Sequence, residues 1–428
     1  MNKENILNDN WKILKFKECI LQLNTGLNPR NHFSLGKGKI KYITAKNLTK
    51  SGPIDFSKCD FIDEKAKAII NKRSNIKIGD ILFSSRSPVG YCHLIKEEPN
   101  YFDIGESIFS IRVNKEIVLP EYLCFYLSSN HFVKLASKNV TGSIIQEIRI
   151  SNLMNTDIII PPKDVQKYIA KTLTNIDKKI ELNNKINFEL ENMAKTIYDY
   201  WFLQFEFPNN EGKPYKSSGG KMVWNEELKK EIPDGWEAKK LINYCSLKNG
   251  INYNNEELSG EKYKIINVRN ISSSTLFIND SILDKISISS DIANKYTIDE
   301  DDILIARSGT PGQVRIIKSN ENIIYSGFII KCKVNEIRYK EYFVYVLKKI
   351  ENSILNQSNG SILKNINQES LSNLTIIIPS MECINNFNNK VIAIHNKIKN
   401  LMEENQELIS LRDYLLPLLM NGQIGFKD

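Results

Sequence analysis

The sequence predicts an α+β fold that is built twice, with two β-rich globular units alternating with two long helices. Three observations lead to this prediction. Two long stretches have apolar residues at helical spacing, and the segments before them consist of short apolar runs broken by turn residues. Both patterns also recur in the same order in the second half of the chain. Because a repeat of this length determines the architecture, each expected element has a counterpart in the other half.

The long helices are expected over residues 164–205 and 382–428, where apolar residues recur at three- and four-residue steps. The apolar positions are Ile169, Leu173, Ile176, Ile180, Leu190, Met193 and Ile197 in the first helix, and Val391, Ile394, Ile398, Leu401, Leu408, Leu411, Leu415 and Leu418 in the second. Such a narrow stripe needs a partner with a similar stripe. The two helices are therefore expected to form an antiparallel coiled coil that relates the two halves by an approximate two-fold axis.

Two asparagines, Asn187 and Asn405, occupy matching positions on these stripes, 218 residues apart (405 − 187). A polar residue buried on a coiled-coil seam reduces stability and can fix the register of the helices. The alternative is that both side chains lie at the edge of the seam, in water.

The globular units are expected to consist mainly of strands. The strand-like runs are KIKYITA, DILFSS, SIFSIRV and TDIIIPP in the first unit, and DILIARS, FIIKCKV and LTIIIPS in the second. One helix is expected in each unit, over 120–138 and 340–355. The turn that follows the DIL run also occurs twice, as residues 79–90 and 301–312, which supports the duplication.

The repeat divides the chain into five parts. These are a first globular unit over 1–163, a helix over 164–205, a linker over 206–234, a second globular unit over 235–381 and a helix over 382–428. The linker is inferred from its glycine, proline and serine residues. Its SSGGK stretch lacks the spacing of a phosphate-binding loop.

Composition limits the class of protein. The 428 residues include 58 Lys and Arg against 50 Asp and Glu, and the net charge of +8 permits a nucleic-acid partner without requiring one. The seven cysteines are scattered and the four histidines have no metal-ligand spacing, so we expect reduced thiols, a cytoplasmic location and no metal site. The N-terminus has no signal-peptide core, and no stretch approaches the ~20 apolar residues of a membrane helix.

Catalytic motifs are missing from the sequence. There is no D/N-P-P-Y/F methyltransferase loop, no glycine-rich cofactor turn, no Walker motif, no nuclease carboxylate cluster and no nucleophile–base pair. We therefore expect no catalytic residue and no cofactor in this chain.

Several stretches point to a family. They are IYDYWFLQFEFP and GKPYKSSGGKMVWNEELKKEIPDGW around the linker, LRDYLLPLLMNGQI near the C-terminus, and the duplicated turns DILFSSRSPVG and DILIARSGTPG. With these stretches the chain resembles, over nearly its whole length, the specificity subunit of Type I restriction-modification systems. One departure is that the arginine of the turn shifts by one position between the copies, from Arg86 to Arg307.

The resemblance implies two target recognition domains in a non-catalytic DNA-binding subunit. The expected partners are double-stranded DNA, two methyltransferase subunits and, where the system includes a nuclease, restriction subunits. S-adenosylmethionine, ATP and Mg²⁺ are then expected in those partner subunits. No membrane partner is expected.

Base reading needs short polar or cationic side chains on loops that fit a groove. The repeat places such residues at equivalent points of both units. In the first unit the candidates are Thr44, Lys46, Asn47, Ser84, Ser85, Arg86, Ser87, Lys138, Thr141, Ser143 and Gln146. In the second unit they are Asn267, Arg269, Asn270, Arg307, Ser308, Thr310, Gln313, Asn359, Ser361 and Lys364. The alternative for each is a solvated turn, and other Lys and Arg residues are expected to contact phosphates.

Two recognition units on one chain predict a bipartite target. The first helical seam, from Ile169 to Ile197, is about 43 Å long at 1.5 Å per residue, and one DNA turn is roughly 34–36 Å. Two short half-sites separated by untouched base pairs are therefore expected. Because the loop sequences differ between the units, the site should be asymmetric. The resemblance implies that binding to this site directs adenine N6-methylation and restriction by the partner subunits.

A partner-subunit interface is expected at the helix ends. The candidate residues are Tyr198, Tyr200, Trp201, Phe202, Leu415 and Leu416. The alternative is that these side chains pack inside the coiled coil. Three other functions remain open at this point: a coiled-coil scaffold without a DNA role, an enzyme with an unrecognised motif, and the specificity subunit of a related two-subunit restriction system.

Overall fold

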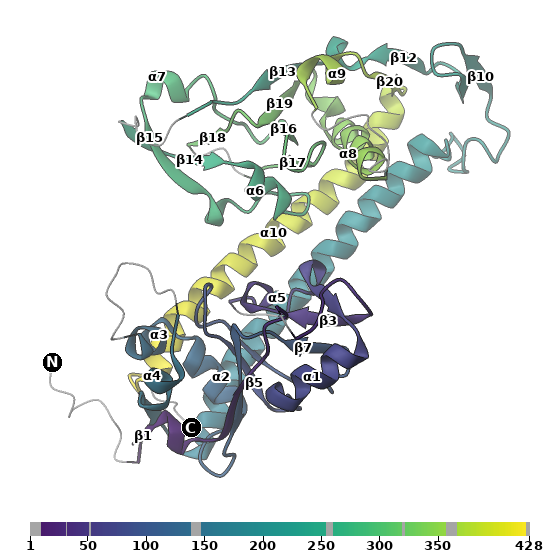
Figure 1. The fold of residues 1–428 in the computed structure, drawn as a ribbon. Coiled ribbons are helices and arrows are strands. Elements are labelled where there is room, and N and C mark those ends of the chain that lie inside the picture. Colours follow the sequence, from purple (N-terminus) through teal and green to yellow (C-terminus); the bar gives the residue numbers. More distant parts are fainter. Residues whose placement is uncertain are drawn as a thin grey trace. The chain divides into compact units, whose positions relative to one another are not determined.

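The computed structural model describes residues 10–30, 32–50, 53–137, 147–253, 260–318, 322–356 and 366–424. It divides into two compact units (Figure 1). Unit 1 comprises residues 1–184 and 403–428, and unit 2 comprises residues 185–402. Each of the two long helices contributes residues to both units.

Unit 1 contains three sheets. The strands are β1 (Lys12–Lys15), β2 (Ile20–Thr25), β3 (Ile40–Ile43), β4 (Asp60–Ile62), β5 (Ile81–Ser84), β6 (Cys92–Leu94), β7 (Phe102–Ile104), β8 (Ile108–Val113) and β9 (Asp157–Ile160). A four-stranded antiparallel sheet has the order β2-β8-β5-β6, a three-stranded sheet has the order β4-β3-β7 with β3 and β7 parallel, and β1 pairs with β9. The helices are α1 (Glu64–Ser74), α2 (Pro120–Ser128), α3 (Asn130–Ala136) and α4 (Ile150–Met154), with 3-10 turns η2 (Phe16–Glu18), η3 (Ala45–Asn47) and η4 (Phe56–Lys58).

Unit 2 repeats these sheets strand for strand. The repeated strands are β12 (Glu237–Lys240), β13 (Cys245–Asn249), β14 (Glu261–Ile266), β15 (Asp284–Ile288), β16 (Asp302–Ala306), β17 (Val314–Ile316), β18 (Ile323–Tyr325), β19 (Ile329–Val334) and β20 (Thr375–Ile378). The sheet orders are β13-β19-β16-β17, β15-β14-β18 and β12-β20, and the β14–β18 pair is again parallel. The helices are α6 (Val268–Ser272), α7 (Ser290–Ala293), α8 (Lys340–Asn356) and α9 (Gln368–Ser372), with 3-10 turns η6 (Leu241–Asn243), η7 (Asp280–Ile282) and η8 (Ile337–Tyr339). The predicted duplication and the predicted strands are confirmed.

The helix expected over 120–138 is in fact two helices. Ser129 has an extended backbone, and its hydroxyl accepts a hydrogen bond from the backbone N–H of Phe132 (3.2 Å), so that it caps α3. Serine is among the strongest N-cap residues, and here capping interrupts a continuous apolar pattern. The helix expected over 340–355 agrees with α8.

The long helices are α5 (Lys163–Tyr198) and α10 (Met381–Met420). The first was expected to reach residue 205, but its last turn, Asp199–Leu203, is a π-helix. Wider π-turns occur mostly as single turns at the ends of or within α-helices. The second was expected to continue to residue 428, but it ends at Met420.

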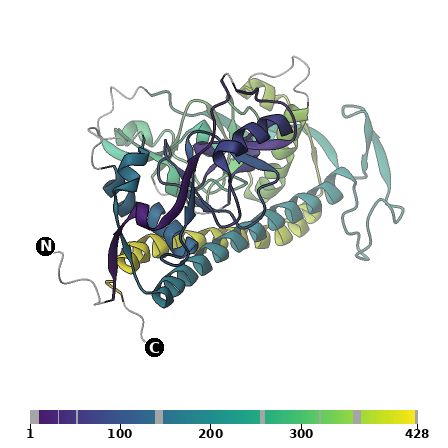
Figure 2. The ribbon, with the colours of Figure 1, turned by 60° about the horizontal axis from the view of Figure 1, so that its bottom comes forward.

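Within unit 1, the two helices lie side by side in both views (Figures 1 and 2). Asp177 of α5 pairs with Arg412 of α10 (3.0 Å), and Asn183 donates a hydrogen bond to Asn405 (2.9 Å). Higher residue numbers in α5 therefore lie next to lower residue numbers in α10, so the two helices are antiparallel. Asn183, Asn187 and Asn405 are all buried, so the alternative of seam-edge asparagines in water is wrong. Across the seam, Asn405 accepts the bond from Asn183 and donates a second one to the Asn184 side chain (2.9 Å).

Within unit 2, the end of α5 packs against the start of α10. The ring of Phe202 makes an edge-to-face contact with Phe387 (5.0 Å between centroids) and lies 4.7 Å from Tyr342 of α8. These rings belong to the largest hydrophobic core of the unit, which also contains Trp201 and Trp236. The same antiparallel arrangement thus holds in this unit.

The segment expected to be a linker is folded. Residues 222–225 (β10, Met222–Asn225) and 230–233 (β11, Lys230–Pro233) form an antiparallel hairpin. Before it, the Phe207 ring stacks on Tyr215 (4.5 Å) and on Trp236 (4.9 Å). The aromatic residues of this segment therefore pack into unit 2, an outcome that its glycine and proline content does not reveal.

Candidate nucleic-acid interface

Four segments of unit 1 meet at one place, which we name loop cluster 1: residues 44–47, 84–90, 105–107 and 147–148. Backbone hydrogen bonds join them. Ser85 N–H donates to Ser107 O (2.9 Å), and Ile148 N–H donates to Ser85 O (2.8 Å). The Ser107 hydroxyl accepts a bond from the backbone N–H of Ala45 (3.0 Å). The structure therefore brings together candidate residues that lie up to 43 positions apart in sequence (87 − 44).

Unit 2 builds the same arrangement, named loop cluster 2: residues 267–270, 306–312, 326–328 and 366. Arg307 N–H donates to Phe328 O (2.8 Å), and Ile366 N–H donates to Arg307 O (3.3 Å). Gly312 N–H closes its turn on Ala306 O (2.9 Å), as Gly90 N–H does on Ser84 O (3.0 Å). Both glycines have positive φ, 85° and 84°, which explains why glycine ends the turn in both copies.

Four candidate side chains are buried and serve the fold. The Asn47 and Asn270 side chains each accept a hydrogen bond from the backbone N–H three residues earlier (2.9 Å in both). The Ser84 hydroxyl contacts Pro88 O and accepts a bond from Tyr91 N–H (2.8 Å). The Ser85 hydroxyl donates to Ser107 O (3.0 Å). Each of these four side chains therefore holds the backbone of its own loop, and we do not propose base contacts for them.

Arg86 is exposed and is held by two carboxylates. Its Nη1 lies 2.7 Å from Glu106 Oε1, and its Nε lies 3.4 Å from Glu147 Oε1. The hydrogen bond that Arg86 donates to Glu106 raises the pKa of Arg86 above its ordinary value, with the charge of Glu147 acting in the same direction. The pKa of Glu106 is lowered, first by a hydrogen bond from the Asn28 side chain and then by Arg86. The guanidinium is thus fixed at the surface as part of an ion-pair network.

Arg269 of loop cluster 2 is held in a similar way. Its Nη2 contacts Asp284 Oδ2, and the Asn267 side chain approaches the same oxygen (3.4 Å). Lys46 is exposed and Arg307 is partly exposed. Neither of these two cations has an ion pair with any residue that the structure describes.

The remaining candidates line the same clusters. Ser87 is exposed, whereas Thr44, Asn267, Ser308, Thr310 and Gln313 are partly exposed. Among the described residues, Thr310 Oγ1 and Gln313 Oε1 have no hydrogen-bond partner. Buried polar atoms are usually paired, and these two oxygens, which are hardly exposed to solvent, are exceptions within the described part of the chain.

The arginine shift between the copies now has a structural explanation. By its backbone hydrogen bonds, Arg307 corresponds to Ser85 rather than to Arg86. Arg86 therefore corresponds to Ser308. The two arginines occupy different places in equivalent turns, so they cannot make the same contact.

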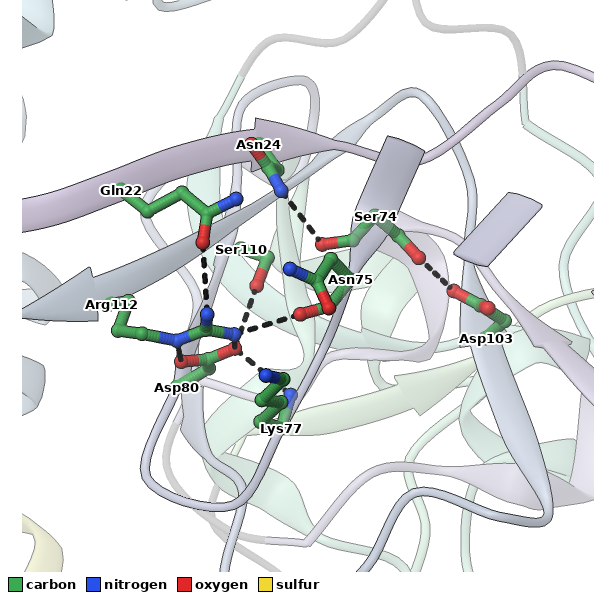
Figure 3. A network of polar contacts seen from close by, with 9 residues as sticks. All are labelled: Gln22, Asn24, Ser74, Asn75, Lys77, Asp80, Asp103, Ser110 and Arg112. Carbon is green, nitrogen blue, oxygen red and sulfur yellow. Dashed lines mark hydrogen bonds and ion pairs between the residues drawn. The ribbon is translucent and has the colours of Figure 1, made fainter. Parts of the chain in front are cut away.

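The strand that leads into the turn of loop cluster 1 is anchored at its other end (Figure 3). Asp80, which is buried, makes two bonds with Arg112 of β8 (2.8 and 2.7 Å), and Arg112 also binds Gln22 of β2 (2.8 Å). In unit 2 the equivalent Asp302 lies 3.3 Å from Lys331. These bonds fix the strands, so the turns stand on a rigid sheet.

Seven candidates from the loop after the helix lie outside the described residues. They are Lys138, Thr141, Ser143, Gln146, Asn359, Ser361 and Lys364. Glu147 and Ile366, which are described next to these stretches, both lie in the loop clusters.

Most of the expected partner-interface residues are core residues. Tyr198, Trp201 and Phe202 are buried in the hydrophobic core of unit 2, which corresponds to the packing alternative. Leu415 and Leu416 are partly buried against the core of unit 1. Only Tyr200 is exposed.

The sequence did not indicate the carboxylates Glu106, Glu147 and Asp284 as parts of the site. Each lies on a segment remote from its arginine in sequence or on a different strand.

Within the described residues there is no group of His, Cys, Asp and Glu that is suited to hold a metal ion, and no helix is long and apolar enough to span a membrane.

Comparison with known proteins adds independent information. The model of the Type I restriction modification DNA specificity domain matches residues 8–192 and 233–404. The MjaIX Type I restriction enzyme specificity subunit of Methanocaldococcus jannaschii is 28% identical, with 98% of this chain and 94% of the relative covered. The HindI specificity subunit of Haemophilus influenzae is 26% identical over 82% of this chain and 87% of its own. A crystal structure of a Type-I restriction-modification system S subunit from M. genitalium has a TM-score of 0.49 and 17% identity, with 99% of both chains covered.

Proposed function

The chain belongs to the Type I restriction modification DNA specificity family and is a non-catalytic DNA-sequence recognition subunit, and on this premise we propose that it reads a bipartite, asymmetric site with loop clusters 1 and 2. Each cluster would read one half-site. The observation that supports this proposal is that the two clusters are built by equivalent backbone hydrogen bonds but present different side chains.

The exposed chemistry of the clusters suits double-stranded DNA. Arg86 and Arg269 offer guanidinium donors, which pair with the O6 and N7 acceptors of guanine. The exposed Ser87 and the partly exposed Ser308, Thr310 and Gln313 suit smaller polar contacts. A scaffold protein without a DNA role would have no need for two polar surfaces built by equivalent backbone hydrogen bonds. The candidates outside the described residues stay part of this proposal.

The partner subunits would supply the chemistry. As a component of a Type I restriction-modification complex, the chain would bring two methyltransferase subunits to adenines near the half-sites, in the cytoplasm, together with restriction subunits where they exist. S-adenosylmethionine, ATP and Mg²⁺ would bind to those subunits. We propose Tyr200, with the partly exposed Leu415 and Leu416, as docking residues, since the other aromatic candidates are buried.

A selection from random DNA tests the proposal. The purified chain, in complex with the methyltransferase subunit of its own system, is incubated at fixed salt with duplexes that contain thirty random base pairs (about three turns). We expect the bound fraction to share two short sequence blocks at constant spacing. Enrichment of no sequence, or of a single continuous block, would contradict the bipartite assignment.

A further inference from the structure

We propose that the carboxylate-held arginines, Arg86 and Arg269, read bases, whereas two other cations of the same clusters, Lys46 and Arg307, which form no ion pair with a described residue, bind backbone phosphates. This inference rests on the proposed function and, within each cluster, assigns base contacts to one cation and phosphate contacts to another. The observation behind it is an exchange between the units. Among the described residues, the arginine of the turn is paired in unit 1 and the cation of the 44–47 segment is not, whereas in unit 2 the pairing is reversed.

For the arginine of the turn, the exchange follows from one residue difference at equivalent positions. In unit 1, Glu106 comes directly after Gly105, whose backbone N–H donates a hydrogen bond to Ile43 O (2.7 Å). In unit 2 the corresponding bond is from Ser326 N–H to Ile266 O (3.0 Å), so that the residue in the place of Glu106 is Gly327. Unit 2 thus has no carboxylate at that place to hold the turn arginine. Asp284 of β15 holds Arg269, whereas the equivalent aspartate of unit 1, Asp60 of β4, forms no ion pair with Lys46.

A carboxylate next to an arginine favours base reading for two reasons. First, it fixes a long side chain that would otherwise lose rotamer freedom on binding. For Arg86, Glu106 and Glu147 engage one N–H of Nη1 and the N–H of Nε, which leaves three of the five guanidinium N–H groups for DNA. The free groups on Nη1 and Nη2 form the edge that spans O6 and N7 of guanine.

Second, the carboxylates weaken phosphate binding. A phosphate next to Arg86 would also face the negative charges of Glu106 and Glu147, so the net attraction is reduced. A neutral guanine edge has no such penalty. Lys46 and Arg307 form no ion pair with a described residue, so no carboxylate of the described part competes with a phosphate for them.

Four single variants test the division, each with its counterpart in the same cluster as control. Arg86→Ala and Arg269→Ala are compared with Lys46→Ala and Arg307→Ala, all in complex with the methyltransferase subunit. The probes are the random duplex library and one 30-base-pair duplex of mixed sequence. On the mixed duplex, the slope of log K against log salt counts phosphate contacts, at about 0.9 per contact.

We expect Arg86→Ala and Arg269→Ala each to relax one base position, in different half-sites, with a loss of discrimination of about 5- to 150-fold there. Lys46→Ala and Arg307→Ala should keep the selected sequence and reduce the salt slope by about 0.9 each. The double variant Glu106→Gln/Glu147→Gln keeps the side-chain size. It should make the slope steeper by about 0.9, because the released Arg86 gains a phosphate contact, and it should relax the base position that Arg86 reads.

The outcomes separate the two proposals. If the unaltered complex selects no sequence, the proposed function itself fails. If it selects a bipartite sequence that Arg86→Ala and Arg269→Ala leave unchanged, or that Lys46→Ala or Arg307→Ala relaxes, the division of work is overturned while the function stands. Thermal unfolding of each variant identifies any change that results from misfolding, and a misfolded alanine variant is replaced by Arg86→Lys or Arg269→Lys, which keeps the charge but not the guanidinium fork.

Discussion

Replacing Phe202 by alanine should destabilise unit 2 strongly. The side chain is 2% exposed and its ring lies within 6 Å of Tyr342, Phe387 and Trp236. Truncating a buried phenylalanine removes its transfer free energy and leaves a cavity, for a total of about 3–5 kcal/mol. That is a large part of the 5–15 kcal/mol that typically separates folded from unfolded domains.

Urea unfolding of the full chain measures this effect, with tryptophan fluorescence as the signal. Trp201 and Trp236 both lie in the same core as Phe202, so their emission reports on it. Tyr200→Ala is the matched control, because Tyr200 lies on the same helical turn but is 38% exposed. We expect a change within about 0.5 kcal/mol for this surface substitution.

The reasoning fails if Phe202→Ala keeps the unfolding midpoint of the unaltered chain. Loss of binding to the methyltransferase subunit at full stability would show that Phe202 is a docking residue and that the buried packing is misinterpreted. Loss of that binding by Tyr200→Ala alone, without a change in stability, would support Tyr200 as part of the partner interface.

Three further predictions concern pH, a turn and the helix seam. Burial raises the pKa of Asp302 above its ordinary value of 3.8, so its contribution to stability is complete below pH 3.8 and is lost as the pH rises through the higher folded-state pKa; melting temperatures of Asp302→Asn should vary less with pH in that window, and an unchanged profile would rule out Asp302 as the cause. Gly90→Ala should lower the stability of unit 1 by more than the ~1–2 kcal/mol of a left-handed non-glycine residue, because a Cβ would lie 2.3 Å from Val133 Cγ2, whereas Gly36→Ala, also at positive φ but with no atom within 4 Å, should show the backbone effect alone. Asn183→Leu should destabilise unit 1 by about 1–3 kcal/mol, because the side-chain oxygen of Asn405 loses its donor, and adding Asn405→Leu should restore most of the loss; equal melting temperatures for the single and the double variant would contradict a role for this pair.

Local patterns were sufficient for much of the fold. Apolar runs such as DILFSS and TDIIIPP became β5 and β9, because a buried strand needs a continuous apolar segment and turn residues at its ends. The helical stripes gave α5 and α10. The break at Ser129 was missed because a cap competes with propensity through a single side-chain hydrogen bond, and a periodicity pattern does not register it.

The site was predictable only in part, for a physical reason. The sequence located the turns and the equivalence of the two copies, but not which way each side chain points. Ser84 and Ser85 face inward, and Arg86 faces outward next to a carboxylate twenty residues away. Contacts of this kind depend on which strands pair. The segments of the cluster are joined by hydrogen bonds between residues far apart in sequence, such as that from Ile148 N–H to Ser85 O.

Mapping of N6-methyladenine by single-molecule sequencing tests the central claim most directly. Genomic DNA is compared from source cells with and without the gene for this chain, with the methyltransferase gene intact in both. Loop clusters 1 and 2 have equivalent backbone hydrogen bonds but different exposed side chains. We therefore predict that one asymmetric motif of two separated blocks loses its methylation when the gene is deleted. If the same methylated motifs remain in both cells, while the methyltransferase subunit is produced, the chain does not select the methylated sequence and the account is wrong.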